Sequence, residues 1–471
     1  MSGLGTIYNQ AQFSMRTWSA TLTRLFEQGA SGARLLRVSD GPTDAYRVLS
    51  LRDTQASIYA YRDNVAEINR RLDNIHANMT EINDLLVRAR VLLSQGAAGT
   101  MSPSNRVPIG NEIDALLEQA VMFANGSDLG RYFFGGSDVL TPPYVVTREN
   151  GKIVAVEYVG SRQNTEVPVA SGVRYSGTLV GDAVFRSQGG GVASFYGPTG
   201  VTAGAGTSTL RGDGWLTFTH DATSFDAASG LSAGSDSATG DTILGSHRVT
   251  IDAVAGTIQL DDGLAVTFDG SETNLQLVNA DGDRLHVNVT GWSGAGGTFA
   301  VTATGWASLD DGLTRVAVTG DNPLAVTDSR TGQTLYIDGS SVRRVGVEPV
   351  RVEGSYDLFG MLINARDLML NDRNLSIPQQ AELLALAERS LMEVFEGVTR
   401  NLASLGGRMQ ALDRLSANLT LTGGMAKTQA DQLQDVDAIT LSMELARAQT
   451  LYELTLASSA KLLQLSLLDY I

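Results

Sequence analysis

Apolar residues recur at steps of three and four positions near both ends of the chain and in short alternating runs in its middle. In the first block this spacing places the apolar side chains on one face of a helix. This N-terminal stripe consists of Ile7, Ala11, Met15, Trp18, Leu22 and Leu25. Gly29 and Gly32 are expected to interrupt the stripe, so one amphipathic helix is predicted within residues 1–35.

The most regular stripe follows a helix-start signal. In Ser39-Asp40-Gly41-Pro42 the serine or aspartate can cap free amide groups, and proline is tolerated in a first helical turn. From Ile58 to Leu93 apolar residues alternate steps of three and four without a break, which favours a left-handed supercoil. A helix over residues 44–94 would be roughly 75 Å long at about 1.5 Å per residue. A third, shorter helix is predicted from Ile109 to Ala124.

Between residues 144 and 352 the pattern changes to short alternating runs separated by glycine-rich turns. Such runs are typical of antiparallel sheets. Residues 187–235 are rich in Gly, Ser, Ala and Thr and are expected to include a mobile loop. Helical spacing returns from Leu384 to Leu419, where it is expected to end near Gly423-Gly424, and appears again over residues 438–468.

These blocks predict an α+β multidomain fold in which a long antiparallel coiled-coil rod, built from both ends of the chain, carries an inserted antiparallel β-rich outer region. The predicted divisions are an N-terminal assembly helix (1–35), the N-terminal part of the rod (36–143), an outer region of one or two domains (144–352), the C-terminal part of the rod (353–424) and a C-terminal assembly helix (425–471). A length of 471 residues suits several domains, because single cores stop growing at about 250–300 residues.

The stripes differ in where their apolar faces are expected to be buried. The stripe from Ile58 to Leu93 has an antiparallel partner within the chain in Leu384–Leu419. The terminal stripes have no further core to cover them, and a two-helix pair buries only one face of each helix, so packing against neighbouring subunits is predicted. The predicted assembly interface consists of Ile7, Ala11, Met15, Trp18, Leu22, Leu25, Leu441, Leu445, Leu451, Leu454, Leu462, Leu465 and Leu468.

Composition narrows the function classes. A net charge of −16 disfavours nucleic acid and anionic membranes as partners, because both reward a basic surface. The absence of cysteine excludes disulfides and cysteine nucleophiles. Residues 1–10 lack the basic and apolar regions of a cleavable signal, and no run approaches 18 apolar residues. A soluble protein is expected, and any export would use another route.

Candidate chemistry is sparse, and neither an enzyme nor a cofactor, catalytic or metal site is expected. The four histidines, His76, His220, His247 and His286, have no partner at metal or catalytic spacing, and His76 is predicted to be exposed. Residues 279–283 are interpreted as a hairpin turn rather than a calcium loop, because the ordered ligand series is missing. Glycines 189–191 are interpreted as a flexible loop. Three tryptophans of the middle region are predicted core aromatics: Trp215, Trp292 and Trp306.

Four stretches carry a resemblance to a known family. They are Arg34–Ala45 (RLLRVSDGPTDA), Gln55 with residues 59–64 (YAYRDN), Ala124-Asn125 with Gly130–Gly136 and Pro142–Tyr144, and Asp437–Ile471. On these the chain resembles the flagellin superfamily, and within it the hook–filament junction proteins of the third hook-associated type. The residues that match the family motifs are Arg34, Ser39, Asp40, Pro42, Asn64, Asn125, Gly130, Phe134 and Gly135. The chain departs from the family at Val38 and Gly41, where proline and a second aspartate are frequent, and its middle is longer.

The resemblance implies a structural component of the bacterial flagellum that joins the hook to the flagellin filament as a ring-like homo-oligomer. It implies a hook-side junction protein, flagellin and a cytoplasmic export chaperone as partners, with no nucleic acid and no membrane insertion. The implied location is extracellular, reached through the flagellar type III system. A flagellin-type filament subunit is the first alternative, although Tyr132–Gly136 stands where flagellins usually carry Phe-Asn-Gly. A secreted adhesin or carbohydrate-binding protein, with the tryptophans as stacking residues, is the second.

Overall fold

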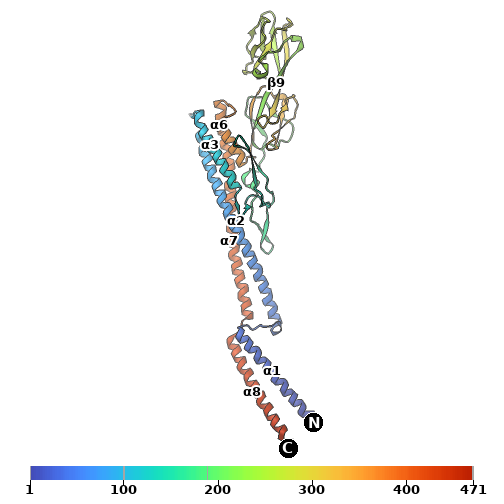
Figure 1. Cartoon of the computed structure of the whole chain (residues 1–471), viewed down its shortest axis with the longest axis vertical. Helices are drawn as coiled ribbons and strands as arrows, with labels where there is room; N and C mark the ends of the chain where they lie inside the picture. The colour runs from blue at the N-terminus through green and yellow to red at the C-terminus, as the bar shows by residue number, and fades with distance from the viewer. Residues whose placement is uncertain (1, 99–100, 188, 469–471) are drawn as a thin grey trace. The chain divides into compact units, whose positions relative to one another are not determined.

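The computed structural model of the chain describes residues 2–98, 101–187 and 189–468 (Figure 1). The chain folds into two compact units. Unit 1 comprises residues 1–70, 166–175 and 409–471, and unit 2 comprises residues 71–165 and 176–408. The fold combines long helices with antiparallel sheets, as the sequence predicts, whereas the five-part domain division stays a prediction.

Unit 1 contains the two terminal helices, α1 (Ser2–Ser31) and α8 (Ala438–Leu468), which pack along each other. Helix α1 ends at Ser31, directly before Gly32 with its φ of +70°, as the sequence predicted, but the interruption predicted at Gly29 is absent. Gly29 lies inside the helix and faces Leu441 of α8, where an added Cβ would come within 3.2 Å of that side chain. The small residue therefore serves a close helix–helix approach. A hairpin of β5 (Glu166–Ala170) and β6 (Val173–Ser176) also belongs mainly to unit 1.

Two long helices, α2 (Pro42–Ala97) and α7 (Ile377–Gln434), contribute residues to both units and run antiparallel within each. In unit 1, Asn69 donates to Asp413 at 2.8 Å, and the space beside Gly423 is filled by Ile58. In unit 2, Thr399 donates to Asn83 at 3.2 Å. Residue numbers that rise along one helix fall along the other. The predicted antiparallel pairing is thus present, while the supercoil stays a prediction.

The long stripe of α2 is buried as predicted. Leu72, Ile75, Met79 and Ile82 have no exposed surface, and Leu384 and Leu412 on α7 have none either. Helix α7 does not end at Gly423-Gly424 but continues to Gln434. Each glycine costs about 1 kcal/mol relative to alanine in a helix interior, and tertiary contacts such as the one with Ile58 override that preference.

The helical part of unit 2 also includes α3 (Pro103–Ala124) and α6 (Leu358–Leu370), which pack on each other, and the single turn α4 (Gly181–Phe185). Two hairpins lie in this unit: β1 (Ser127–Asp128) with β2 (Arg131–Tyr132), and β3 (Tyr144–Glu149) with β4 (Lys152–Tyr158). Arg366 of α6 is buried because Asp114, Asp367 and the carbonyl of Ile153 all accept from it. Such pairing is what a buried guanidinium requires.

The β-rich region of unit 2 centres on an antiparallel sheet. Its strands, in spatial order, are β13 (Val266–Thr267), β12 (Thr257–Leu260), β11 (Gly245–Asp252), β16 (Gly297–Ser308), β9 (Gly212–Phe225), β20 (Gly346–Val352) and β7 (Ala193–Phe195), and β17 (Val316–Ala317) pairs with β16. Strand β9 lies within residues 187–235, where the sequence predicted a mobile loop. It is an inner strand of the sheet, and its alternating residues Leu216 and Phe218 are buried.

Two separate apolar cores flank this sheet. The first includes Leu216, Leu335 and Val350, and a sheet of β18 (Leu324–Thr327), β19 (Thr334–Asp338) and β8 (Thr202–Ala203) covers it. The second includes Val249 and Leu285, and a sheet of β10 (Ser232–Ala233), β15 (Arg284–Asn288) and β14 (Leu275–Val278) covers that one. Strand β16 supplies Ala307 to the first core and Val301 and Ala303 to the second, so one strand connects the two cores.

Candidate functional site: the terminal helix pair and the motif residues

The terminal helix pair has a thin interior. On α1 only Leu25 and Gln28 are buried among the described side chains, while Ala11, Met15, Trp18 and Leu22 are half-buried. The α1 residues predicted for the assembly interface therefore face α8 at least in part. The side chain of Ile7 lies outside the described residues.

Helix α8, like α1, has few buried and several half-buried side chains. Leu441, Leu445 and Leu451 of the predicted interface are half-buried, and Ala448 and Ser459 between and beyond them are buried. The small side chains allow the two helices to approach closely. The side chains of Leu462, Leu465 and Leu468 lie outside the described residues.

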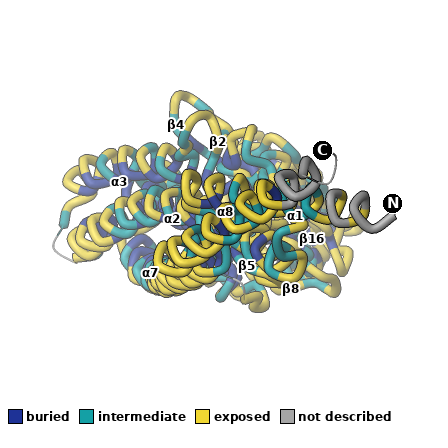
Figure 2. Tube along the Cα trace, turned by 90° about the horizontal axis from the view of Figure 1, so that it is seen from below, coloured by how far each residue is buried: buried dark blue, intermediate teal, exposed yellow. Residues whose placement is uncertain are grey.

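A second apolar stripe on α8 faces away from α1. Ile439 is 72 % exposed, Met443 62 % and Leu454 59 %. Their spacings of four and eleven residues keep them within about 60° of one another at about 100° per residue. The exposed residues along α8 are visible in Figure 2. Of the three, only Leu454 was predicted from the sequence, because α8 is apolar on two faces and periodicity alone does not tell which one packs inward.

The motif residues before α2 form a compact linker in unit 1. Asp40 accepts from the backbone amides of Leu36 and Arg37 at 3.2 and 2.8 Å, which closes a turn. Pro42 is the first residue of α2, as the start signal predicted. Ser39 is exposed. Arg34 donates hydrogen bonds to Asp44 on α2 and to the carbonyl of Leu433 on α7. Asn64, on α2, donates to the carbonyl of Pro168 at 2.8 Å and so ties the β5–β6 hairpin to the helix.

The motif after α3 builds an aromatic core in unit 2. The Asn125 amide exchanges two 2.9 Å hydrogen bonds with the backbone of Tyr144. Phe134 is fully buried, with its ring 4.9 Å from that of Phe185. A Cβ at Gly135 would lie 2.0 Å from the carbonyl oxygen of Asp138, so only glycine fits there. Gly130 has a φ of +74°, in the left-handed region. These residues therefore have structural roles.

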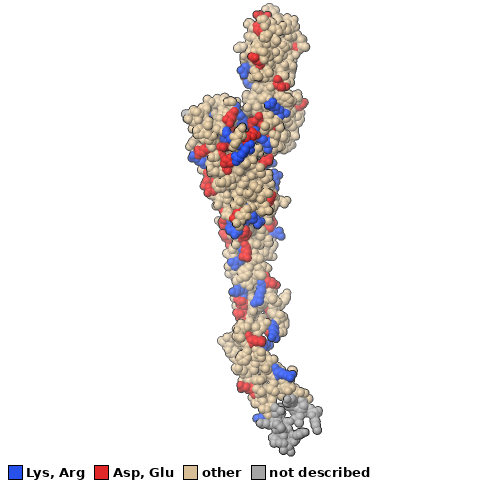
Figure 3. Space-filling view, in the orientation of Figure 1, with Lys and Arg blue, Asp and Glu red and all other residues tan. Residues whose placement is uncertain are grey.

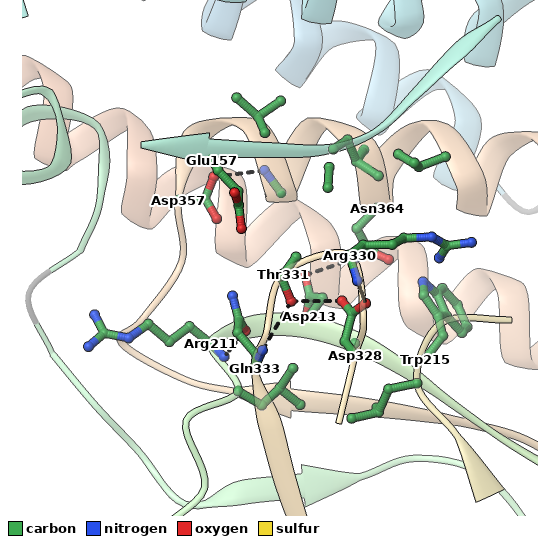
Figure 4. A pocket seen from close by; sticks show the side chains of 18 of the residues that line it. Glu157, Arg211, Asp213, Trp215, Asp328, Arg330, Thr331, Gln333, Asp357 and Asn364 are labelled. Carbon is green, nitrogen blue, oxygen red and sulfur yellow. Dashed lines mark hydrogen bonds between the residues drawn. The ribbon is translucent and has the colours of Figure 1, made fainter. Parts of the chain in front are cut away.

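A polar cavity with a volume of about 380 Å³ lies in unit 2, beside β9 and α6 (Figure 4). Figure 4 shows Asp213 and Asn364 side by side on its wall, joined by a 2.8 Å hydrogen bond. Burial raises the pKa of Asp213 to about 6, even though the Arg351 guanidinium lies 2.9 Å away. The face of Trp215 is covered by Arg373, 4.6 Å from the ring centroid. That contact occupies the ring on this side.

Several charged side chains around this cavity belong to one chain of ion pairs. Figure 3 shows acidic and basic side chains interleaved on the visible face of unit 2. A chain of ion pairs connects α3, α6, two loops of the β region and β3: Asp114, Arg366, Asp367, Arg373, Asp311, Arg330 and Glu149. Each of these charges has an opposite neighbour. The ion pairs tie these elements of unit 2 to one another.

The tryptophans and three of the histidines have partners within unit 2. Trp215, Trp292 and Trp306 are each half-buried, and Trp292 packs edge-to-face on Phe268 at 4.9 Å. The structure brings three histidines to aspartates that are distant in sequence. His286 lies 2.9 Å and His220 3.9 Å from the buried Asp241, and His247 lies 2.7 Å from Asp261. His76 is half-buried rather than exposed.

The Asp241 cluster offers no reactive group to solvent. The hydroxyls of Thr223 and Ser237 both donate to Asp241, at 2.9 and 2.6 Å, and the carboxylate is fully buried. Burial lowers the pKa of His220. Within residues 2–98, 101–187 and 189–468, no group of three or more His, Asp or Glu side chains could hold a metal ion. None of the described helices is both long and apolar enough to cross a membrane.

In its described parts the chain combines three features: terminal helices that pair with each other, long antiparallel helices, and a β region inserted between them in the sequence. These features define its structural class. No protein-family model matches the chain. Among curated proteins it is similar to flagellar hook-associated protein 3 of Escherichia coli (strain K12), 24 % identical over 182 residues, or 38 % of this chain and 55 % of that protein. The chain therefore matches about half the length of this relative. The resemblance stated from the sequence is confirmed.

The chain is also similar to solved structures of two flagellar proteins. Xanthomonas campestris FlgL is 21 % identical, with 80 % of this chain and 98 % of that chain covered and a TM-score of 0.41. Hook-associated protein-3 of Legionella pneumophila is 15 % identical, with 82 % and 98 % covered and a TM-score of 0.44.

Proposed function

We propose that this chain is a structural component of the bacterial flagellum that joins the hook to the filament and assembles through α1 and α8. The observation that carries the proposal is the outward stripe of α8, where Ile439, Met443 and Leu454 stay exposed although the opposite face packs on α1. Apolar patches of this kind mark protein–protein interfaces. The similarity to a flagellar hook-associated protein supplies the context.

The proposed interface combines both terminal helices. The predicted residues from Ala11 to Leu25 on α1 pack with Leu441, Leu445 and Leu451 on α8. The outward stripe, which includes the predicted residue Leu454, meets neighbouring subunits. Phe13 on α1, 69 % exposed, extends the apolar surface. A stack of such pairs from many subunits would bury the faces that a single pair leaves in water.

The thin interior suggests how assembly is confined to the growing end. With so few buried side chains in the pair, the helices gain little apolar burial in a free subunit, and ordering them costs conformational entropy. We propose that they order when a subunit adds to the tip, where new burial offsets that entropy. Hydrogen exchange on the purified subunit tests this: fast exchange at residues 15–25 and 451–468 is expected, and strong protection there would contradict it.

The same proposal includes the partners that the resemblance implies. The chain would form a ring between a hook-side junction protein and flagellin, after export through the flagellar type III system with a cytoplasmic chaperone on its C-terminal segment. Its location would be extracellular. Neither catalysis nor a cofactor has a role in this function.

Deletion of the gene followed by electron microscopy and cell fractionation tests the junction role. Intact hooks without filaments, with flagellin released into the medium, are expected. Unchanged filaments would overturn the proposal. A second measurement separates the filament-subunit alternative: purified chain added to hook ends should bind in a short layer and stop, whereas unlimited growth would identify a flagellin-type subunit.

A further inference from the structure

The two linkers of unit 1, residues 32–41 before α2 and 435–437 before α8, are hydrogen-bonded to each other. Ala33 and Asp435 form an antiparallel bridge. The backbone amide of Arg34 donates to the carbonyl of Gln434 at 2.7 Å, and that of Val436 donates to the carbonyl of Gly32 at 2.9 Å. The linker from α1 to α2 and the linker from α7 to α8 therefore form one hydrogen-bonded unit, called the joint below.

The side chain of Arg34 lies at the centre of this joint. Its Nη2 donates to Asp44 Oδ2 at 2.7 Å and to the carbonyl of Leu433 at 2.9 Å. Leu433 and Gln434 are the last residues of α7, whose final carbonyls lack partners within the helix. Backbone and side chain of Arg34 together satisfy two of them. A cation at this helix end also meets the negative end of the helix dipole.

The carboxylate that pairs with Arg34, Asp44, also lies at a helix end that favours its charge. Asp44 lies in the first turn of α2, where a negative charge is favoured by the positive end of that helix dipole. The carbonyl of Arg34 in turn accepts from Gln28 Nε2 at 2.6 Å, and Gln28 is only 8 % exposed on the last turn of α1. Residue 34 thus contacts α1, α2 and α7, and its neighbours hold the segment that leads into α8.

We propose that Arg34 is a positioning residue for assembly, which locks the paired linkers so that α1 and α8 leave the α2–α7 pair together and present the outward α8 stripe to a neighbouring subunit. The inference rests on the proposed function above. Arginine suits the role because its planar guanidinium directs two hydrogens of one nitrogen at two fixed acceptors, whereas the lysine ammonium is a flexible point charge.

The test compares Arg34→Ala and Arg34→Lys with Arg37→Ala, a matched control in the same linker. Arg37 has a largely exposed side chain, 75 %, and its ion-pair distance to Glu27 is 4.0 Å. Hydrogen exchange on the full-length chain is expected to show protected amides at Arg34 and Val436 in the wild type and in Arg37→Ala. In Arg34→Ala the amide of Val436 should exchange at least roughly ten-fold faster, with unit 2 unchanged.

Addition to hook ends is the functional readout, and partial rescue by Arg34→Lys separates a positioning role from general loss of stability. Addition to purified hook ends is expected to fall at least roughly ten-fold for Arg34→Ala, to be partly restored in Arg34→Lys, and to match the wild type in Arg37→Ala. If Arg34→Ala adds as well as the wild type, the positioning role is overturned while the proposed function stands. If the wild type itself does not add to hook ends, the proposed function fails, and the exchange at Val436 still decides whether Arg34 locks the linkers.

Discussion

Units 1 and 2 differ in what they do with apolar side chains and with charge. Unit 1 has 13 Lys and Arg against 14 Asp and Glu, whereas the remaining residues have 22 against 37, so the net charge of −16 lies almost entirely in unit 2. Unit 2 has closed apolar cores and pairs part of its charge in a chain of ion pairs. Unit 1 leaves apolar residues of its terminal helices exposed.

The difference indicates a division of roles. A nearly neutral surface with exposed apolar stripes lets identical copies approach without strong mutual repulsion and bury those stripes. An acidic surface over satisfied cores favours solubility and discourages association. We therefore expect that replacing buried apolar side chains lowers the free energy of unfolding in unit 2. Replacing exposed apolar side chains of the terminal helices in unit 1 should lower assembly instead.

The largest effect on stability is expected for Phe134→Ala in unit 2. This side chain is fully buried in the aromatic core, so the substitution leaves a cavity and should lower the free energy of unfolding by about 3–5 kcal/mol. Denaturant unfolding followed by circular dichroism measures it. Val254→Ala is the control, because Val254 is fully exposed, and it should be neutral. Similar effects for both would contradict the view of unit 2 as a set of closed cores.

A slightly smaller effect is expected for Asp310→Ala. Asp310 accepts from both the amide and the hydroxyl of Thr314, at 2.8 and 2.6 Å, and of Ser329, at 3.0 and 2.6 Å. Leaving these donors without an acceptor should cost about 2–3 kcal/mol. Asp281→Ala, at an exposed turn, is the control.

The same carboxylate adds a pH dependence. Burial alone would raise the pKa of Asp310, but the hydrogen bonds from Ser329 and Thr314 outweigh it and hold the pKa well below its usual range. Its stabilisation is therefore present above its ordinary pKa near 4 and is lost as the pH falls towards the lower folded-state value. The wild type should lose stability on acidification relative to Asp310→Ala. If the difference in stability between the wild type and Asp310→Ala did not change with pH, this explanation would be wrong.

Asp213 should show the opposite dependence. Its pKa is raised to about 6 by burial, so the folded state binds a proton more tightly than the unfolded chain does. The stability of the wild type relative to Asp213→Asn should therefore fall as the pH rises from about 4 to about 6, by on the order of 2 kcal/mol. Unfolding titrations of both chains across this range measure it, and a rise in relative stability would show that the Arg351 pair dominates.

The smallest effect on stability, and the sharpest test of the comparison, is expected for the triple substitution of Ile439, Met443 and Leu454 by serine. These side chains are mostly exposed, so the free energy of unfolding should change by less than about 0.5 kcal/mol per site. Addition to hook ends should nevertheless be lost. The matched control is Ser442→Ala with Ser458→Ala, at exposed positions of the same helix. Normal addition of the triple variant would break the proposed division of roles.

Much of the helical architecture could be predicted from the sequence. The stripe from Ile58 to Leu93 and its partner from Leu384 to Leu419 are buried as expected, because a repeat of three and four positions is a local property of the chain. Helix ends were less accurate. Gly29 and Gly423-Gly424 were expected to interrupt or end helices, but the contacts with Leu441 and Ile58 come from residues hundreds of positions away.

The motif residues were recognised by resemblance, but their roles were not. Arg34 could be marked, whereas its contacts with Leu433 and Gln434 depend on how two distant linkers meet. The pairs His286–Asp241 and His247–Asp261 were missed for the same reason, because the sheet register sets which side chains face each other.

The sequence by itself therefore determined which segments are helical, which are β-rich, and that the termini carry apolar stripes, since these depend on neighbours along the chain. Only the tertiary structure decided that Leu441 and Leu445 of α8 turn towards α1 while Ile439 and Met443 stay exposed. Both faces of α8 are apolar, and the choice between them is made by the packing partner, which periodicity does not encode.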